Sequence, residues 1–225
     1  MLLPIEGDIV LALVDNNPLA MLEAHPDKEG NALDLGGRTA QAWIEELRAD
    51  LAVIREHLPL LREEIDLILH QLVPVGYDEQ KHLSASYREA IGTVYLTLHP
   101  QRMTMVEAVI HEYQHNKLNA VVELDPLLQN PPGELHTSPV RPDPRPLFGI
   151  LLAVHAFVPV AELYRRRMAI DDPQGRLQER HARIVKGNRE GLDVLLAHGR
   201  PTAAGRALLE ELDRRERESR LHHAK

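Results

Sequence analysis

The sequence predicts a mainly helical α+β domain with a small sheet. Apolar residues recur at helical spacing between Arg38 and Leu72, which indicates a core-facing helix. The β-branched and aromatic run Thr93–Leu98 indicates a strand. A second helical pattern follows this strand, from about Met105 to Glu123. Helices are expected to make up the rest and to close the other side of the domain.

The composition limits the classes of protein and site that are possible. At 225 residues, the chain fits one domain, or one domain with a small helical appendage. Because it contains no cysteine, any metal must be bound by His, Asp or Glu. The net charge of -8 argues against a nucleic-acid or anionic-membrane surface and favours a peptide or a small molecule as the partner.

No segment predicts export or insertion into a membrane. The longest apolar runs, Ile9–Val14 and Leu147–Val160, are shorter than the ~20 residues that span a bilayer. Residues Met1–Asp8 include acidic side chains and no basic one, unlike the start of a secretory signal. The expected location is therefore the cytoplasm.

Proline and capping residues set the expected limits of the first elements. Pro59 is expected to divide the first long helical pattern in two. The strand Thr93–Leu98 stops at His99-Pro100 and is expected to be an edge strand. Thr104 followed by Glu107 is a capping-box signature, which predicts the start of the next helix. That helix should end before Pro126.

A proline-rich segment separates these elements from the last ones. It runs from Pro131 to Pro146 and predicts an ordered loop or a linker. Leu147–Met168 then predicts a buried helix that is kinked at Pro159. From Gln174 onward the amphipathic pattern predicts two surface helices and a frayed tail. We therefore expect one domain over residues 1–170, with a helical extension over residues 171–225 packed on the same domain.

The segment His111-Glu112-Tyr113-Gln114-His115 lies inside the second predicted helix. Residues four apart share a helix face, so His111 and His115 can direct ring nitrogens at one cation. In zinc peptidases, a glutamate at the place of Glu112 acts as general base on the metal-bound water. The sequence therefore predicts a zincin-like metal helix packed behind the small sheet, with Glu112 as the candidate catalytic residue.

The motif by itself is a weak signal. With 13 histidines in 225 residues, chance gives about 0.07 such patterns in a chain of this composition. The alternative interpretation is two solvated histidines on a helix face. The context favours the metal site, because the motif lies in a helix directly after a strand, as a metal helix behind a substrate-binding edge requires.

A metal centre of this kind needs a third protein ligand, and the residues just after the motif do not provide one. His136 lies in the loop before the proline-rich run, and His155 lies on the apolar helix, where an unpartnered imidazole is costly. Glu162 is seven residues and ~10 Å further along the same helix, so His155 and Glu162 cannot both be ligands.

We favour His155 as the third ligand, with Glu162 in an outer position. Glu162 is the alternative ligand and would complete a set of two histidines and one carboxylate. The structural interpretation of His155 is a core histidine that is bonded to a backbone carbonyl.

The run Arg141-Pro142-Asp143-Pro144-Arg145-Pro146 places two guanidinium groups on a stiffened backbone just before this helix. Such arginines suit bidentate binding of a carboxylate. The alternative is a surface loop in which Asp143 pairs with one arginine.

Three segments together resemble a known family. They are Val109-Ile110-His111-Glu112-Tyr113-Gln114-His115-Asn116-Lys117-Leu118-Asn119, Ser138-Pro139-Val140-Arg141-Pro142-Asp143-Pro144-Arg145-Pro146-Leu147 and Ala153-Val154-His155-Ala156-Phe157. They are similar to the HExxH-domain proteins associated with ribosomally made, modified peptides. Members of that group are described as 2-oxoglutarate-dependent peptide β-hydroxylases. The resemblance spans about Gly92–Arg166, and the metal motif combined with the arginine–proline run is far more specific than either part.

The resemblance implies an iron(II)- and 2-oxoglutarate-dependent oxygenase that hydroxylates a side-chain β-carbon of a peptide in natural-product biosynthesis. His111 and His115 would hold the iron, and His155 is the candidate third ligand. Arg141 or Arg145 would bind the 2-oxoglutarate carboxylate. The partner would be a ribosomal precursor peptide. Three protein ligands leave octahedral iron two positions for the keto acid and one for oxygen.

Two other functions stay open on the sequence alone. In a zinc peptidase, Glu112 would activate the water and the strand Thr93–Leu98 would align the substrate backbone. A non-catalytic binding protein would keep the helix but hold no metal. In the oxygenase, by contrast, Glu112 would orient a ligand or the substrate amide through hydrogen bonds.

Overall fold

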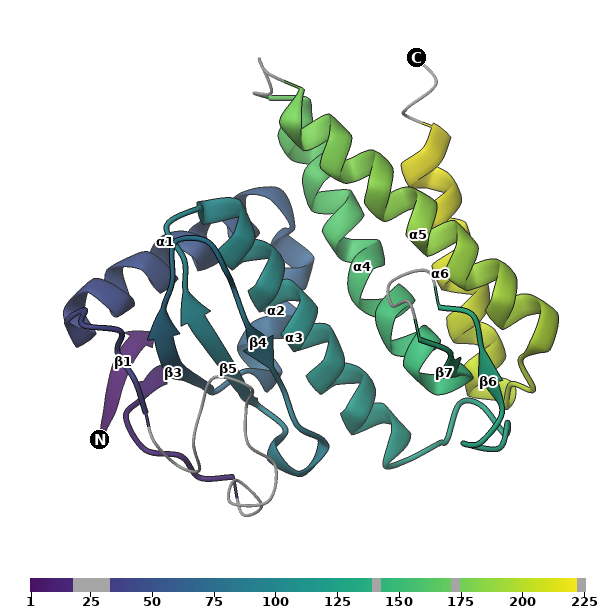
Figure 1. Cartoon of the computed structure of the whole chain (residues 1–225), viewed down its shortest axis with the longest axis horizontal. Coiled ribbons are helices and arrows are strands. Elements are labelled where there is room, and N and C mark those ends of the chain that lie inside the picture. The colour runs from purple at the N-terminus through teal and green to yellow at the C-terminus, as the bar shows by residue number, and fades with distance from the viewer. Residues whose placement is uncertain (18–32, 139–142, 171–174, 222–225) are drawn as a thin grey trace. The chain divides into compact units, whose positions relative to one another are not determined.

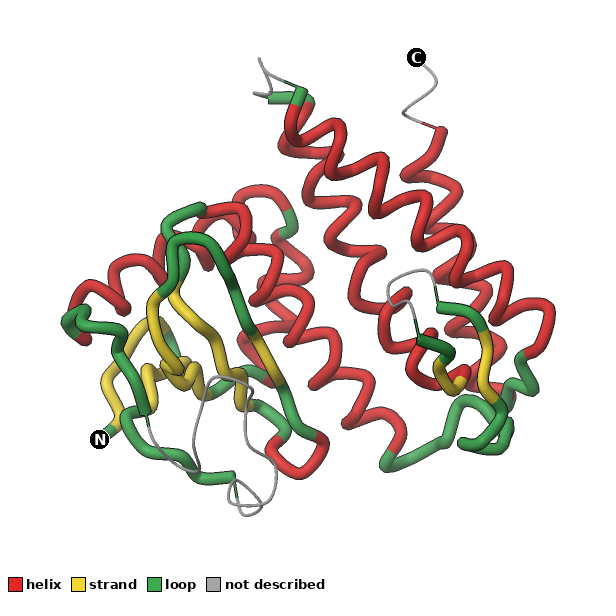
Figure 2. Tube along the Cα trace, viewed as in Figure 1, coloured by secondary structure: helices red, strands yellow, loops and turns green. Residues whose placement is uncertain are grey.

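A computed structural model describes residues 1–17, 33–138, 143–170 and 175–221. The chain forms two compact units, Met1–Asn119 and Ala120–Lys225. The first unit combines a sheet with helices, and the second is almost entirely helical (Figures 1 and 2). The predicted class, a mainly helical α+β protein with a small sheet, is confirmed.

The first unit contains a mixed five-stranded sheet in the order β1-β2-β3-β5-β4. The strands are β1 (Leu2–Glu6), β2 (Ile9–Ala12), β3 (Gln71–Tyr77), β4 (Ser84–Ala85) and β5 (Thr93–Leu98). β2, β3 and β5 are parallel, whereas β1 and β4 run antiparallel to their neighbours. The two antiparallel strands form the two edges of the sheet.

The predicted strand Thr93–Leu98 is present as β5, but its expected place at the edge is wrong. β5 pairs with β3 on one side, and on the other with β4, where Ser84 lies opposite Leu96 and Ala85 opposite Tyr95. All six residues of β5 are buried. The edge next to the HExxH motif is therefore β4, which is too short for its sequence pattern to predict.

Three helices accompany the sheet: α1 (Ala40–His57), α2 (Pro59–Ile68) and α3 (Arg102–Val122), whose last three residues fall in the second unit. They cover one face of the sheet (Figure 1). The Thr39 side chain accepts a hydrogen bond from the Ala42 amide and caps α1. Pro59 begins α2, so the predicted division of the first helical pattern at this proline is confirmed. Trp43 and Leu47 of α1 are fully buried in the core.

α3 carries the HExxH motif and begins earlier than predicted. Thr104 and Glu107 lie inside the helix, so the capping-box interpretation is wrong. The amides of Thr104 and Met105 donate instead to the carbonyl oxygen of Gln101, which lies just before the helix. The helix ends at Val122, within one residue of the predicted end.

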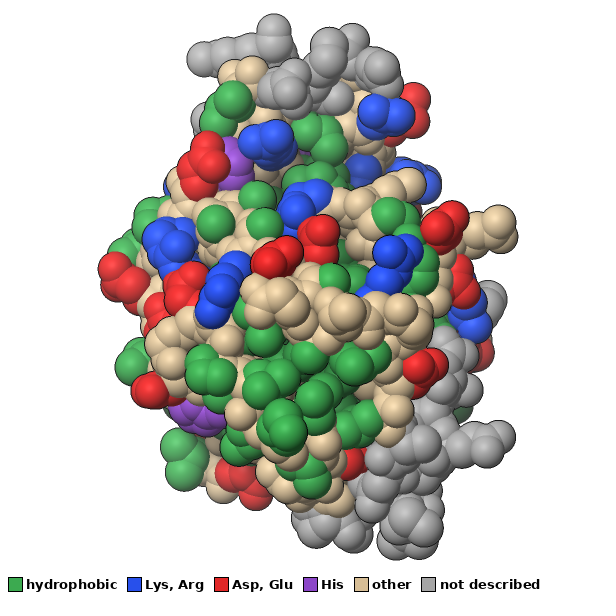
Figure 3. Space-filling view, turned by 90° about the vertical axis from the view of Figure 1, so that its left-hand side faces the viewer, with side chains coloured by type: hydrophobic (Ala, Val, Ile, Leu, Met, Phe, Trp, Pro, Cys, Tyr) green, Lys and Arg blue, Asp and Glu red, His purple; other side chains and the backbone are tan. Residues whose placement is uncertain are grey.

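The other edge of the sheet, at β1, has exposed apolar residues and an irregular register. Met1 is 75% exposed and Leu2 is 50% exposed, and Figure 3 shows hydrophobic side chains gathered on the face of the molecule that contains β1. Pro4 has no amide hydrogen, and the register shifts between Pro4 and Glu6. A proline and an irregular register both hinder the pairing of a further strand with an edge strand.

The second unit contains α4 (Leu147–Met168), α5 (Arg176–His198), α6 (Ala203–Leu221) and the strand pair β6 (Leu135–His136) and β7 (Arg145–Pro146). α4 packs against both α5 and α6. The expected division at residue 170 separates α4 from α5, two helices that pack together here. The predicted pair of C-terminal helices is confirmed, and Pro159 lies within a continuous α4.

α4 is the one helix of the described residues that is long and apolar enough to cross a membrane. At 22 residues it is longer than the apolar run seen in the sequence. Its most apolar window is 72% buried, as in the core helix of a soluble protein.

Candidate metal centre

The two histidines of the motif lie side by side on α3. Their ring centroids are 4.3 Å apart with an angle of 62° between the ring planes. Ligand atoms of His111, Glu112 and His115 all lie within 4.8 Å of one another. Within the described ranges, no other group of three His, Asp or Glu side chains is this close. The helical spacing of the motif therefore produces the predicted juxtaposition.

The side chain of Glu112, on α3, points towards the edge strand β4, and Glu112 is only 4% exposed. The Ser84 hydroxyl donates to Glu112 Oε1 at 2.8 Å, and the Ser86 hydroxyl donates to Oε2 at 2.7 Å. His115 Nδ1 lies 3.5 Å from Oε2. Both carboxylate oxygens therefore have a partner inside the protein.

The environment of Glu112 favours its charged form. Burial raises its pKa, but hydrogen bonding by His115, the charges of the two motif histidines and the bond from Ser86 outweigh burial and hold the pKa at about 2. Hydrogen bonds donated to a carboxylate stabilise the ionised state in this way. Glu112 is thus an anion throughout the physiological pH range.

The serines that hold Glu112 were missed in the sequence. Ser84 and Ser86 are two residues apart, so in extended chain they point to the same side, here towards α3. The alternation His82-Leu83-Ser84-Ala85-Ser86 is the signal that could have identified them. It spans only five residues and contains small polar side chains that are also common in loops.

Asn116 fixes α3 against the beginning of β5. It is fully buried, and its Oδ1 accepts a hydrogen bond of 2.7 Å from the Gly92 amide. Its Nδ2 donates to the carbonyl oxygens of Thr93 and Glu112. One side chain therefore connects the backbone of the motif to the sheet.

His82 lies near the motif glutamate, on the segment before β4. Both of its ring nitrogens are buried and make no hydrogen bond of normal geometry, and its ring packs edge-on against His99 with centroids 6.2 Å apart. Burial and the nearby His99 lower its pKa to about 4, against smaller opposing effects of the Thr97 backbone and Glu112. His82 is therefore neutral at pH 7.

His155, the favoured third ligand, is buried on α4 in the second unit. The structure brings together His111, Glu112 and His115 in the first unit, and His155 is not among them. His136 lies in the short strand β6 and not in a loop as expected, and its Nε2 is 3.0 Å from Glu134 Oε1.

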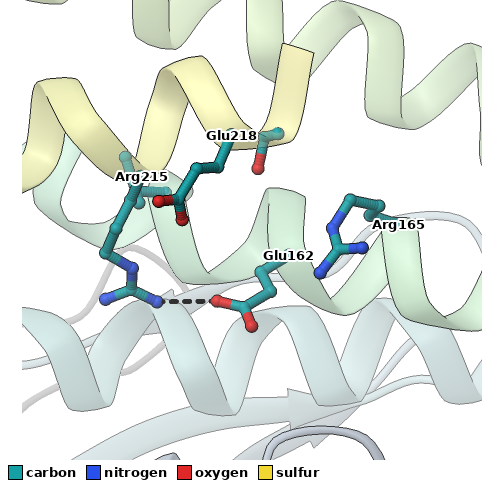
Figure 4. A pocket seen from close by; sticks show the side chains of 6 residues that line it. Glu162, Arg165, Arg215 and Glu218 are labelled. Carbon is teal, nitrogen blue, oxygen red and sulfur yellow. Dashed lines mark hydrogen bonds and ion pairs between the residues drawn. The ribbon is translucent and has the colours of Figure 1, made fainter. Parts of the chain in front are cut away.

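Glu162, the alternative ligand, is already paired with two arginines. Its Oε1 accepts from Arg166 at 2.5 Å and its Oε2 accepts from Arg215 at 2.9 Å. It lines a cavity of about 170 Å³ between α4 and α6, together with Arg165 and Glu218 (Figure 4). Burial raises its pKa, but the bonds and charges of the two arginines outweigh burial and lower it. Binding a metal here would require breaking both ion pairs.

Of the two arginines expected to bind a carboxylate, Arg145 is described and Arg141 lies outside the described residues. Arg145 Nε is 2.8 Å from Asp143 Oδ2, and both side chains are well exposed. This is the pairing that the structural interpretation of the loop expects.

The residues on α3 fit a first-row metal ion. Two imidazoles are donors that zinc and iron(II) both accept, and the ligand atoms of the two histidines lie within 4.8 Å of each other with the Glu112 carboxylate beside them. Comparison with models of known protein families and with curated protein sequences finds no match to this chain. The geometry of the site is therefore the basis for any functional proposal.

Proposed function

We propose that this chain is an iron(II)- and 2-oxoglutarate-dependent oxygenase that hydroxylates a side-chain β-carbon of a peptide, in the modification of ribosomally made peptides. His111 and His115 hold the metal, and His155 is the proposed third ligand. Arg141 or Arg145 binds the carboxylate of 2-oxoglutarate. When bound, iron and the keto acid supply the oxidation, in which one oxygen molecule yields succinate, carbon dioxide and a C–OH group. The fold around the motif is proposed to be zincin-like.

The observation that favours this proposal is the hydrogen bonding of Glu112. Its two oxygens accept hydrogen bonds from Ser84 and Ser86. A carboxylate in this state is suited to orienting a neighbouring group and poorly suited to removing a proton from water. An oxygenase does not need Glu112 as a base.

A peptide substrate is supported by the edge strand. β4 pairs with β5 on one side, and its other side ends the sheet among the described residues. An extended peptide can add to such an edge through main-chain hydrogen bonds. The serines of the same segment contact Glu112, so a peptide on this edge lies beside the motif. The proposed aligning strand is β4 and not β5.

The same edge also supports the second candidate, a zinc peptidase with Glu112 as general base. The two candidates differ in the metal, in the need for oxygen and in the effect of Glu112→Gln. This variant abolishes cleavage by a peptidase that retains zinc. In the oxygenase it removes an orienting carboxylate, which weakens metal binding and leaves measurable turnover.

The test uses protein purified without air and loaded with iron(II). We expect 2-oxoglutarate to be converted into succinate only when oxygen is present, even without a peptide, and His111→Ala to abolish the conversion. Zinc in the purified protein together with peptide cleavage that Glu112→Gln abolishes would overturn the proposal. If the chain binds neither iron(II) nor zinc, the result supports the remaining candidate, a non-catalytic binding protein.

A further inference from the structure

The segment that contains β4 contacts the motif through alternate side chains. Ser84 lies opposite Leu96 in the antiparallel register of β4 and β5, and Ser86 lies two residues further along. Each hydroxyl donates to a different oxygen of Glu112. The two bonds fix both the position and the rotation of the carboxylate group, which a single bond cannot do.

The Glu112 carboxylate faces one ring nitrogen of a motif histidine. Glu112 Oε2, which accepts from Ser86 at 2.7 Å, lies 3.5 Å from His115 Nδ1. A neutral imidazole carries one proton, and a carboxylate neighbour favours that proton on the nearer nitrogen. His115 Nε2 then has a lone pair available for a cation. Carboxylates orient metal-binding histidines in this way, and losing one typically weakens metal binding 10- to 100-fold.

We propose that Ser84 and Ser86 are positioning residues of the metal centre. Through Glu112 they hold the His115 ring with Nδ1 towards the carboxylate, which leaves Nε2 to bind the metal. This inference rests on the proposed metal centre but not on the reaction that the metal supports. It also joins the open sheet edge to a metal ligand, because the same short segment forms the edge and carries both serines.

Ser86 is expected to matter more than Ser84. It donates to Oε2, the oxygen nearer to His115, whereas Ser84 donates to Oε1. If the serines only attach the edge strand to α3, removing either should lower stability and leave the metal affinity of the folded protein unchanged. If they position His115, metal affinity should fall in folded protein, more for Ser86→Ala than for Ser84→Ala.

The test measures the dissociation constant for cobalt(II) by competition with a chelator, in the full chain and without substrate. We expect Ser86→Ala to weaken binding by up to ~10-fold, the lower end of the loss that follows removal of an orienting carboxylate, with a smaller loss for Ser84→Ala. Ser86→Thr keeps a hydroxyl at the same place and should restore most of the affinity. Thr97→Val is the matched control, because Thr97 Oγ1 is buried on β5 and makes no hydrogen bond among the described residues.

Circular dichroism and urea unfolding of the metal-free variants separate positioning from stability. An unchanged cobalt(II) affinity in folded Ser86→Ala overturns the inference, as does an equal loss in Thr97→Val. If Ser86→Ala does not fold, Ser86→Thr is compared with Ser86→Val, which has the same shape but no hydroxyl. Ser86→Val should bind cobalt(II) less tightly, and equal affinities would overturn the inference. If the protein does not convert 2-oxoglutarate but the serine variants lose cobalt(II) affinity as expected, the proposed reaction is wrong and this inference still holds.

Discussion

Asn116 Oδ1 accepts a hydrogen bond of 2.7 Å from the amide of Gly92, which joins the motif helix α3 to the start of β5. Asn116 directly follows His115 in the chain, so this bond fixes the position of the motif relative to the start of β5. Its side-chain amide also donates to the carbonyl oxygens of Thr93 and Glu112. The motif is therefore attached to the sheet through a residue that is not part of the motif.

Replacing Asn116 should destabilise the fold around the motif. Asn116→Leu leaves the Gly92 amide and the Thr93 carbonyl without their partner in the core, at about 1–3 kcal/mol for each group. We expect urea unfolding to show a loss of roughly 2–4 kcal/mol in the free energy of unfolding. Asn119→Leu, one turn further along the same helix, should change it far less. Equal losses in the two variants would show that the bonds of Asn116 are not what holds the helix.

Asp50 should make stability depend on pH. Burial raises its pKa from 3.8 to about 7, against the hydrogen bond and charge of Arg102. Because the pKa is higher in the folded than in the unfolded chain, folding is favoured when Asp50 is protonated, and this contribution is lost as pH rises towards 7. Asp50→Asn removes the effect and keeps an acceptor for Arg102.

The measurement for Asp50 is the free energy of unfolding at pH 5 and at pH 8. Relative to Asp50→Asn, the wild-type protein should lose on the order of 2 kcal/mol over this range. Comparing the two proteins at each pH cancels the titration of all other groups. A difference that does not change with pH would contradict the raised pKa.

Two glycines inside helices should respond oppositely to alanine. A Cβ atom on Gly205 of α6 would lie 1.9 Å from the carbonyl oxygen of Leu127, whereas one on Gly187 of α5 would meet nothing within 4 Å. Alanine in a helix interior is favoured over glycine by roughly 0.5–1 kcal/mol. We expect Gly187→Ala to stabilise the protein by about that amount and Gly205→Ala to destabilise it by about 1–3 kcal/mol, as overpacking does. Thermal and urea unfolding check both variants, and stabilisation by Gly205→Ala would contradict the packing of Leu127 on α6.

The arginines of the proline-rich loop are tested by the concentration of 2-oxoglutarate that gives half-maximal succinate formation. Charge-assisted hydrogen bonds are worth about 1.5–3 kcal/mol, so losing the binding arginine should raise this concentration at least ~10-fold. We expect the rise in Arg141→Ala or in Arg145→Ala. Asp143→Ala, which removes the partner of Arg145, should not produce it. If neither arginine variant changes the half-maximal concentration of 2-oxoglutarate, the arginines do not bind the keto acid and the role of the loop is structural.

The elements with long or regular patterns could be predicted from the sequence. The division at Pro59, the strand Thr93–Leu98 and the motif helix follow from periodicity, proline and β-branched residues. The start of α3 could not be predicted, because Thr104 and Glu107 match a capping box but their backbone groups are already helical. A capping-box pattern does not distinguish a helix that begins at that pattern from one that begins a few residues earlier.

The partners of the site residues could be predicted only in part. The juxtaposition of His111 and His115 follows from their spacing of four on a helix. The partners of Glu112 depend on β4, a strand of two residues that exists because it pairs with β5. The ion pairs of Glu162 involve Arg215, which is distant in sequence, so no local pattern identifies them. Pairings that are set by tertiary contacts are the part that a single sequence leaves undetermined.

The most direct test of the central claim is the amount of metal bound by the chain and its histidine variants, measured after anaerobic loading with iron(II) and removal of excess ion. We predict about one ion per chain for the wild-type protein and for His136→Ala, and almost none for His111→Ala and His115→Ala, with all variants folded by circular dichroism. Wild-type protein that binds no ion, or His111→Ala and His115→Ala variants that bind as much as the wild type, would contradict a metal centre on α3.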